Sequence, residues 1–291
     1  MTAEPATLKL PPLLVERAVA TALQEDLGQA GDITTDAIIP ASASADAEIV
    51  ARKPGVIAGL DLAAASFKTL DPDAQFVAEV ADGTKVAAGA RIARVQGRTR
   101  ALLSAERVAL NFLGHLSGIA TLTATYVAAV NGTKARIACT RKTTPGLRAL
   151  EKYAVRAGGG MNHRFGLYDA VLVKDNHIAG AGGLAPALTQ LRARTGHLVK
   201  IEVEVDTLDQ LDEALHFPID AVLLDNMDLA TLKKAVALVN GRVATEASGG
   251  VTLETVRKIA ETGVDLISVG ALTHSAPVLD LALAWSGSRQ Q

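Results

Sequence analysis

Positively charged side chains gather in one stretch, between positions 140 and 177, that also holds three consecutive glycines. Two cations follow the apolar run 135–139 and another follows the run 170–173, which is where buried strands should end. A single charge at a strand end is usually solvated surface, but several cations within one strand-helix-strand unit predict a site that binds anions. The candidate residues are Arg141, Lys142, His163, Arg164 and Lys174.

Carboxylates end the next two apolar runs. Glu204 and Asp225 stand where the runs 199–205 and 221–224 stop. Opposite a phosphate site they would hold Mg²⁺ or sugar hydroxyls, although they could also act as general acid and base or neutralise nearby cations. Glu202 alternates in register with Glu204, so both can face the same side of a strand, and the residues alone do not decide between them.

Small residues end the last two runs. A serine and glycines between a strand and a helix expose backbone N–H groups that can bind phosphate, although a plain tight turn explains the first group equally well. A zinc site at His163 is not expected, because no cysteine or tight histidine cluster accompanies it. The small residues and the histidine beside them are Ser248, Gly249, Gly250, Gly270 and His274.

The elements that must position these residues are six apolar runs that alternate with helical segments after position 112. Runs that are apolar almost throughout predict parallel strands buried on both faces. We therefore predict an incomplete TIM-like α/β barrel over residues 113–275, with a doubly wound open sheet as the alternative. The helical segments are expected to begin near Pro145, Ala185, Leu208, Leu229, Leu253 and Pro277.

The chain before position 113 has a different pattern. Short strand-like runs and helices mix there, which predicts an N-terminal α+β, sandwich-like domain over residues 1–112, with the C-terminal tail 276–291 packed on it. Residues 31–35 are expected to form a turn-rich loop. The uncharged stretch 108–133 is predicted to be a buried helix rather than a membrane span, because it contains Asn111, His115 and Ser117.

Composition narrows the class of protein. The 291 residues are 49% hydrophobic and 21% charged, which is typical of a folded globular protein. A net charge of −2 and an aromatic content of 3% argue against a nucleic-acid binder. Cys139 lies in an apolar run and is predicted to be buried, and the N-terminus lacks the form of a signal peptide, so we expect a cytoplasmic location.

Long ordered motifs carry a resemblance to one enzyme family. The run RKTTPGLRALEKYAVRAGGGMNHRFGLYDAVLVKDNHI, followed by EVEV, LLDNM, EASGGV and ISVGALTHS, resembles the carboxylating nicotinate-nucleotide pyrophosphorylases, also called quinolinate phosphoribosyltransferases. The resemblance extends to GDITT and SAERVALNFLGHLSGIAT and so covers nearly the whole chain. It implies that quinolinate and phosphoribosyl pyrophosphate yield nicotinate mononucleotide, pyrophosphate and CO₂ with Mg²⁺, a step of NAD biosynthesis.

The resemblance also implies roles for individual residues. Lys142, Lys174, Glu204 and Asp225 would be catalytic, and the last two would hold Mg²⁺ directly or through water. The implied quinolinate pocket consists of Arg107 from the other subunit of a homodimer together with Arg141, Lys142, His163, Arg164 and Lys174. The implied phosphoribosyl pyrophosphate site consists of Glu204, Asp225, Ser248, Gly249, Gly250, Gly270 and His274.

Three other functions fit the residues less well. A barrel lyase could use Lys174 or Lys200 as a Schiff base, although Lys200 stands early in its strand. A related transferase could act on a different heterocycle. The chain could also be a catalytically silent protein that binds anions.

Overall fold

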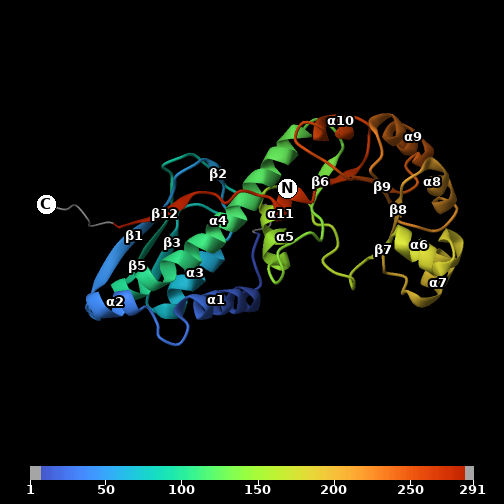
Figure 1. Cartoon of the computed structure of the whole chain (residues 1–291). Helices are drawn as coiled ribbons and strands as arrows, with labels where there is room; N and C mark the ends of the chain where they lie inside the picture. The colour runs from blue at the N-terminus through green and yellow to red at the C-terminus, as the bar shows by residue number, and fades with distance from the viewer. Residues whose placement is uncertain (1–7, 286–291) are drawn as a thin grey trace, which may run out of the picture. The chain divides into compact units, whose positions relative to one another are not determined.

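The computed structural model describes residues 8–285, which divide into two units (Figure 1). One unit comprises the described residues up to Ala124, the segment Leu150–Gly159 and the described residues from Ser275, and the other comprises Thr125–Ala149 and Gly160–His274. The expected boundary between positions 112 and 113 falls inside the continuous helix α4 (Thr99–Ala129). A boundary inside a helix leaves no change of composition to mark it.

An antiparallel sheet forms the centre of the first unit. Its strand order is β12-β1-β5-β3, and β2 pairs separately with β4. Residues alternate along β1, so that Ala47, Ile49 and Ala51 are buried. The strands are β1 (Ser44–Ala51), β2 (Gly55–Val56), β3 (Gln75–Ala78), β4 (Lys85–Val86), β5 (Arg91–Arg98) and β12 (Leu281–Trp285).

Helices α3 and α4 contribute to the core that lies against this sheet (Figure 1). Phe67 of α3 and Leu113 of α4 are fully buried in the same cluster as Ile49 and Ile92 of the strands. The helices of this unit are α1 (Pro12–Leu27), α2 (Ile33–Ile38), α3 (Leu60–Leu70) and the greater part of α4. The N-terminal part of the chain is thus an α+β unit.

Helix α4 is long and apolar enough to cross a membrane by length and composition alone. Half of the most apolar 18-residue stretch of this helix is buried inside the protein. Ala105, Ala109 and Leu113 of α4 belong to the hydrophobic core cluster. A polar side chain of the helix is also hydrogen-bonded inside the protein, since the Ser117 hydroxyl accepts a hydrogen bond of 3.0 Å from the Ala58 backbone N–H. These features are those of a core helix.

Two expectations for this unit are wrong. Residues 33–38 form α2 rather than a loop, because the Asp32 carboxylate accepts the Thr35 backbone N–H at 2.9 Å and caps the helix. The segment after Pro277 is strand β12 rather than a helix, because it pairs antiparallel with β1 and so satisfies the backbone of that strand.

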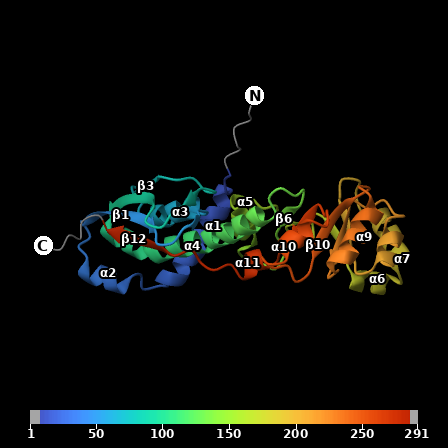
Figure 2. The same cartoon turned by 90° about the horizontal axis from the view of Figure 1, so that it is seen from above.

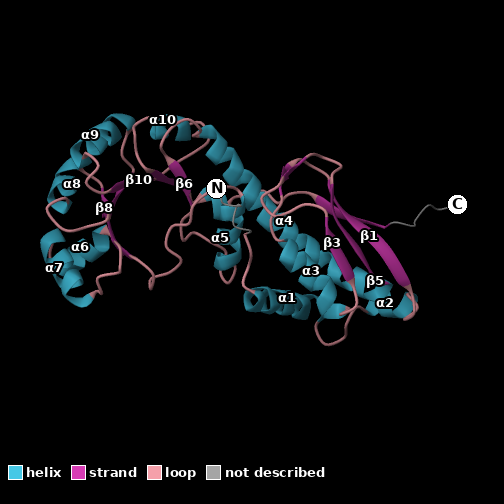
Figure 3. Ribbon diagram, turned by 180° about the vertical axis from the view of Figure 1, so that it is seen from behind, coloured by secondary structure: helices cyan, strands magenta, loops and turns pink. Residues whose placement is uncertain are grey.

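The second unit is built on six parallel strands in the order β6-β11-β10-β9-β8-β7. The strands form an arc with the helices on its outer side (Figure 3), and Figure 2 shows the same unit from above. Among the described residues β6 and β7 do not pair, so the barrel is incomplete. The strands are β6 (Arg136–Ala138), β7 (Val171–Val173), β8 (Ile201–Val205), β9 (Ala221–Asp225), β10 (Ala244–Ser248) and β11 (Leu266–Ser268).

The helices follow the expected alternation with two additions, one directly after β7 and one directly after β11. A short helix directly after β7 was not predicted, because its sequence DNHIAGA has no apolar periodicity and none of its residues is buried. The helices are α5 (Arg148–Ala157), which continues into the first unit, α6 (Asp175–Ala181), α7 (Leu184–Arg194), α8 (Leu208–Ala214), α9 (Leu229–Val239), α10 (Val256–Ala260) and α11 (Ala271–His274).

The parallel register brings the strand-end residues level with one another. Ser248 of β10 lies opposite Asp225 of β9, and Glu204 of β8 lies opposite Leu223. An isolated parallel bridge between Ala138 and Met161 draws the loop after α5 to the edge of β6. The barrel therefore carries its charged side chains at the carboxyl ends of its strands.

Candidate active site

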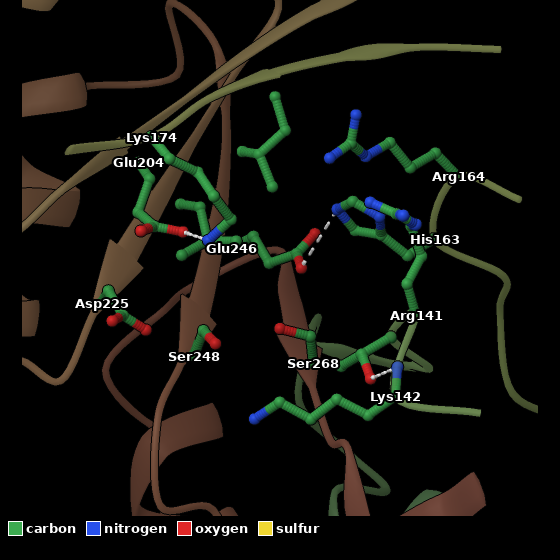
Figure 4. Close-up of a pocket in the computed structure, with 13 residues that line it drawn as sticks. Arg141, Lys142, His163, Arg164, Lys174, Glu204, Asp225, Glu246, Ser248 and Ser268 are labelled. Carbon is green, nitrogen blue, oxygen red and sulfur yellow. Dashed lines mark hydrogen bonds and ion pairs between the residues drawn. The ribbon is translucent and has the colours of Figure 1, made fainter. Parts of the chain in front are cut away.

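A cavity of about 440 Å³ opens at the carboxyl ends of the barrel strands. Its volume is within the usual range for a site that binds small molecules. Charged side chains of both signs point into it from the strand ends and from the loop after α5 (Figure 4). The lining residues are Thr140, Arg141, Lys142, His163, Arg164, Leu172, Lys174, Glu204, Leu223, Asp225, Glu246, Ser248 and Ser268.

Two arginines occupy one side of this cavity. The Nε atoms of Arg141 and Arg164 are buried and have no hydrogen-bond partner among the described residues. Burial, and secondly the positive charge of Arg141, lower the pKa of Arg164, and its Nη1 donates to the Ala170 carbonyl at 3.1 Å. Two guanidinium groups with unused donors form a site for carboxylate or phosphate.

Lys174 lies on the other side and is not free. Its ammonium group donates to the Glu204 carboxylate, whose side chain is 12% exposed. The two residues end neighbouring strands, β7 and β8, which explains their contact. Lys200 lies at the opposite end of β8, where its side chain is 78% exposed and pairs with Asp220 at 2.6 Å.

His163, Glu202 and Glu246 form a buried cluster beside the cavity. His163 Nε2 lies 2.8 Å from Glu202 Oε2 and 3.7 Å from Glu246 Oε1, and the three side chains are 13%, 12% and 4% exposed. Burial, and secondly the negative charge of Glu202, raise the pKa of Glu246 to about 7, while His163 opposes that shift. The structure thus separates Glu202 from Glu204, since Glu202 pairs with His163 and Glu204 with Lys174.

Oxygen ligands suited to a hard cation stand at two places. The Asp225 side chain lines the cavity and accepts from Asn226 Nδ2 at 2.7 Å, which leaves its other oxygen available. Glu204, on the adjacent strand β8, lines the same cavity. Carboxylate oxygens of this kind suit Mg²⁺. In the cluster of His163, Glu202 and Glu246, whose ligand atoms lie within 4.8 Å of one another, His163 and Glu202 are engaged with each other.

The loops after β9 and β10 lie against each other. Asn226, in the left-handed region at φ 52°, donates its backbone N–H to the Ser248 carbonyl at 3.0 Å. Gly249 has φ 95°, and a Cβ atom there would lie 3.0 Å from the Asn226 backbone nitrogen and closer still to its side-chain oxygen. This position therefore requires glycine, and the turn exposes backbone next to Asp225.

Gly270 lies between two predicted site residues. A Cβ atom at Gly270 would lie 3.1 Å from Lys142 Cδ and 3.2 Å from His274 Nε2. The Thr273 hydroxyl donates to the Lys142 carbonyl at 2.7 Å and fixes that loop. The structure thus brings the first and last strand ends of the barrel together.

Most of the predicted site residues lie at this one cavity, and some do not. The residues outside its lining are Arg107, Gly249, Gly250, Gly270 and His274. Arg107 is on α4 in the first unit, where it is exposed. Glu246 and Ser268 line the cavity although they were not singled out from the sequence. The signal for Glu246 was present, because it stands two positions before Ser248 and so faces the same side of its strand.

Comparison with known proteins assigns the family. Residues 32–117 match the N-terminal domain of quinolinate phosphoribosyl transferase and residues 119–284 match its C-terminal domain. A nicotinate-nucleotide pyrophosphorylase [carboxylating] from Mycobacterium leprae is 47% identical over 270 residues, which is 91% of this chain and 95% of that protein. A probable nicotinate-nucleotide pyrophosphorylase [carboxylating] from Bacillus subtilis is 46% identical over 259 residues, 89% of each chain.

A solved structure agrees with the sequence relatives. The crystal structure of NadC from Streptococcus pyogenes superposes with a TM-score of 0.91 at 40% identity, over 95% of this chain and 99% of that one. Matches of this length and identity extend over both units. The chain belongs to the quinolinate phosphoribosyl transferase family.

Proposed function

We propose that the barrel cavity joins quinolinate to the ribosyl carbon of phosphoribosyl pyrophosphate and then releases CO₂. The chain is a decarboxylating quinolinate phosphoribosyltransferase, as relatives that match 90–92% of it are named, and so an enzyme of NAD biosynthesis. The observation that supports this cavity as its site is the pair of buried arginine Nε donors without partners. A dianion with two adjacent carboxylates offers acceptors for both.

Quinolinate is assigned to the arginine side of the cavity. Arg141 and Arg164 each present a guanidinium fork that matches a carboxylate, and Lys142 and His163 stand beside them. Arg164 is held by the Ala170 carbonyl, so its fork is positioned before the substrate arrives. Prior positioning lowers the entropic cost of binding.

Phosphoribosyl pyrophosphate is assigned to the other side. Ser248, Gly249 and Gly250 present backbone N–H groups to phosphate, and Gly270 and helix α11, which ends at His274, follow the neighbouring strand β11. Glu204 and Asp225 face the space between the two substrates and would hold the ribose hydroxyls and Mg²⁺, directly or through water. Bound Mg²⁺ neutralises the charge of the departing pyrophosphate.

The two halves of the cavity account for the first chemical step. With the pyridine nitrogen directed at the anomeric carbon, the C–O bond to pyrophosphate breaks as the N–C bond forms, and positive charge develops on the sugar. Glu204 and Asp225 stabilise that charge. Lys174, paired with Glu204, is placed to orient the pyridine ring.

The alternatives receive less support from the site. A Schiff-base lyase needs a neutral lysine, but Lys174 is ion-paired with Glu204 and Lys200 is exposed at the opposite end of its strand. A transferase for a monocarboxylic heterocycle would leave one of the two arginines without an acceptor. The two unused Nε donors favour a dicarboxylate over nicotinate.

The test is a direct assay of the purified protein. Quinolinate, phosphoribosyl pyrophosphate and Mg²⁺ should together yield pyrophosphate, nicotinate mononucleotide and CO₂, and nicotinate in place of quinolinate should give far less product. Borohydride treatment should trap no adduct. Turnover of nicotinate at a rate equal to that of quinolinate would contradict the dicarboxylate assignment.

The assembly and location are part of the same proposal. We place the enzyme in the cytoplasm as a homodimer in which the exposed Arg107 of one copy completes the quinolinate site of the other. Mixing an Arg107→Ala chain with a Lys142→Ala chain should restore part of the activity that each lacks alone. Cell fractionation tests the location.

A further inference from the structure

Decarboxylation of the pyridine nucleotide requires a proton donor in addition to groups that bind the substrate. When the 2-carboxylate of the pyridine nucleotide leaves as neutral CO₂, the electron pair of the broken C–C bond stays on the ring carbon. That carbon must then take up one proton in every turnover. A side chain that carries a proton at neutral pH and lies within the cavity can supply it directly.

Few of the lining side chains can supply that proton. Arginine does not give up its proton in proteins, which excludes Arg141 and Arg164. Lys174 is engaged with Glu204, and Lys142, which also lines the cavity, is exposed to solvent rather than buried. Glu246, in contrast, lines the cavity with a side chain 4% exposed, and its Oε1 is buried without a hydrogen-bond partner among the described residues.

The surroundings of Glu246 favour the protonated form of its carboxyl group. Glu202 from β8 contributes a negative charge close by, His163 from the loop after α5 contributes an opposing contact at 3.7 Å, and the Ser268 hydroxyl of β11 lies against it. The balance of burial and these charges raises the pKa of Glu246 to about 7. His163 Nε2 is drawn instead to Glu202, at 2.8 Å, which leaves the acid of Glu246 available to the cavity.

We infer that Glu246 is the acid that protonates the ring carbon vacated by CO₂, and that Glu202 and His163 are the positioning residues that hold it in place. The inference rests on the proposed decarboxylating function. The bond from the ring carbon to the carboxylate breaks and CO₂ departs without charge. The bond from the ring carbon to hydrogen forms with the proton of Glu246, which becomes a carboxylate and regains a proton from water.

Glu246→Gln tests this role because the amide keeps the shape of the side chain but cannot donate a proton to carbon. In a single turnover of the Mg²⁺-loaded enzyme, pyrophosphate should appear within about threefold of the wild-type rate, while CO₂ should appear about 100-fold more slowly. Labelled ¹³CO₂ should exchange into the 2-carboxylate of the accumulated nucleotide, because the unprotonated carbanion recaptures CO₂. Glu213→Gln, an exposed site on α8, is the matched control and should change neither rate.

Each outcome is decisive. Unchanged CO₂ release, or equal slowing of pyrophosphate and CO₂, would overturn the role of Glu246 as an acid and leave it a packing residue. Substrate-free binding of Mn²⁺ that is lost in Glu246→Gln would overturn it in favour of a cation site. If the variant does not fold, the wild-type rate of CO₂ release should fall as pH rises through 7 while pyrophosphate release does not. Absence of pyrophosphate from the wild type would instead contradict the proposed function.

Discussion

Replacing Arg164 by lysine separates the shape of the guanidinium from its charge. The lysine keeps the positive charge but cannot present two parallel N–H donors to a carboxylate. Each hydrogen bond between charged groups stabilises by about 1.5–3 kcal/mol, so losing one should raise the KM for quinolinate about ten- to hundredfold. The KM for phosphoribosyl pyrophosphate should stay within about twofold, because that substrate is assigned to the other side of the cavity.

The stability of the same variant gives an independent check. Without a substrate, Arg164 Nε is buried without a partner, which costs about 1–3 kcal/mol, and the substitution removes that cost. It also removes the hydrogen bond to the Ala170 carbonyl, worth about 1 kcal/mol. The two changes oppose each other, so the free energy of unfolding of the free protein should be little changed.

The assay is steady-state kinetics with quinolinate varied at saturating phosphoribosyl pyrophosphate, together with urea unfolding of the free protein. Arg257→Lys is the control, because Arg257 is exposed and pairs with Glu261 at 2.7 Å on the outside of the barrel. A variant destabilised by more than about 2 kcal/mol with unchanged KM for quinolinate would refute the reasoning. Arg164 would then be a structural residue.

Four further predictions follow from the two units. Gly249→Ala should raise the KM for phosphoribosyl pyrophosphate and lower the free energy of unfolding by about 1–3 kcal/mol. The reason is that a φ of 95° and the nearby Asn226 leave no room for a Cβ atom. Steady-state kinetics and thermal melts test the two effects. Tyr153→Phe should cost about 1–3 kcal/mol in urea unfolding, because its hydroxyl donates at 2.5 Å to Asp82, whose pKa burial raises. Removing Mg²⁺ with EDTA should abolish pyrophosphate release, and added Mg²⁺ should restore it, whereas full activity without divalent cations would contradict the assigned role. The pKa of Glu246 is about 7 in the folded protein and 4.5 in the unfolded chain. Between these two pH values the folded protein binds more protons than the unfolded chain. The free energy of unfolding should therefore fall as pH rises from 4.5 to about 7. Unfolding free energies of the wild type and Glu246→Gln, compared across pH, measure it.

The sequence predicted the barrel well because its signal is local. Each apolar run of four to seven residues ends where the structure ends a strand within about two positions, as for 221–224 and β9 (Ala221–Asp225). The strand ends then identify the side chains that face the cavity, since parallel strands share one direction. Helix α2 was missed because its start depends on a cap by the Asp32 side chain. Strand β12 was missed because it forms by pairing with β1, which is far away in the sequence.

The pairings inside the site could not be predicted from the order of the residues. Glu202 and Glu204 have the same type and face, and only the three-dimensional neighbours separate them. Glu204 contacts Lys174 because β7 and β8 are adjacent, whereas His163 reaches Glu202 from a loop that follows α5. Side-chain partners of this kind depend on which segments the fold places across the barrel interior.

Strand order explains why the site joins the two ends of the barrel sequence. In the sheet β6 pairs with β11, so the loop that carries Lys142 lies beside the loop that carries Gly270, although more than a hundred positions separate them. The early loops that carry the cations proposed to bind quinolinate and the late loops proposed to bind phosphate are thereby adjacent. A doubly wound open sheet, the alternative from the sequence, would add a new strand at an outer edge and separate these loops. Return of the last parallel strand to the first is therefore the structural step that brings the two proposed substrate sites together.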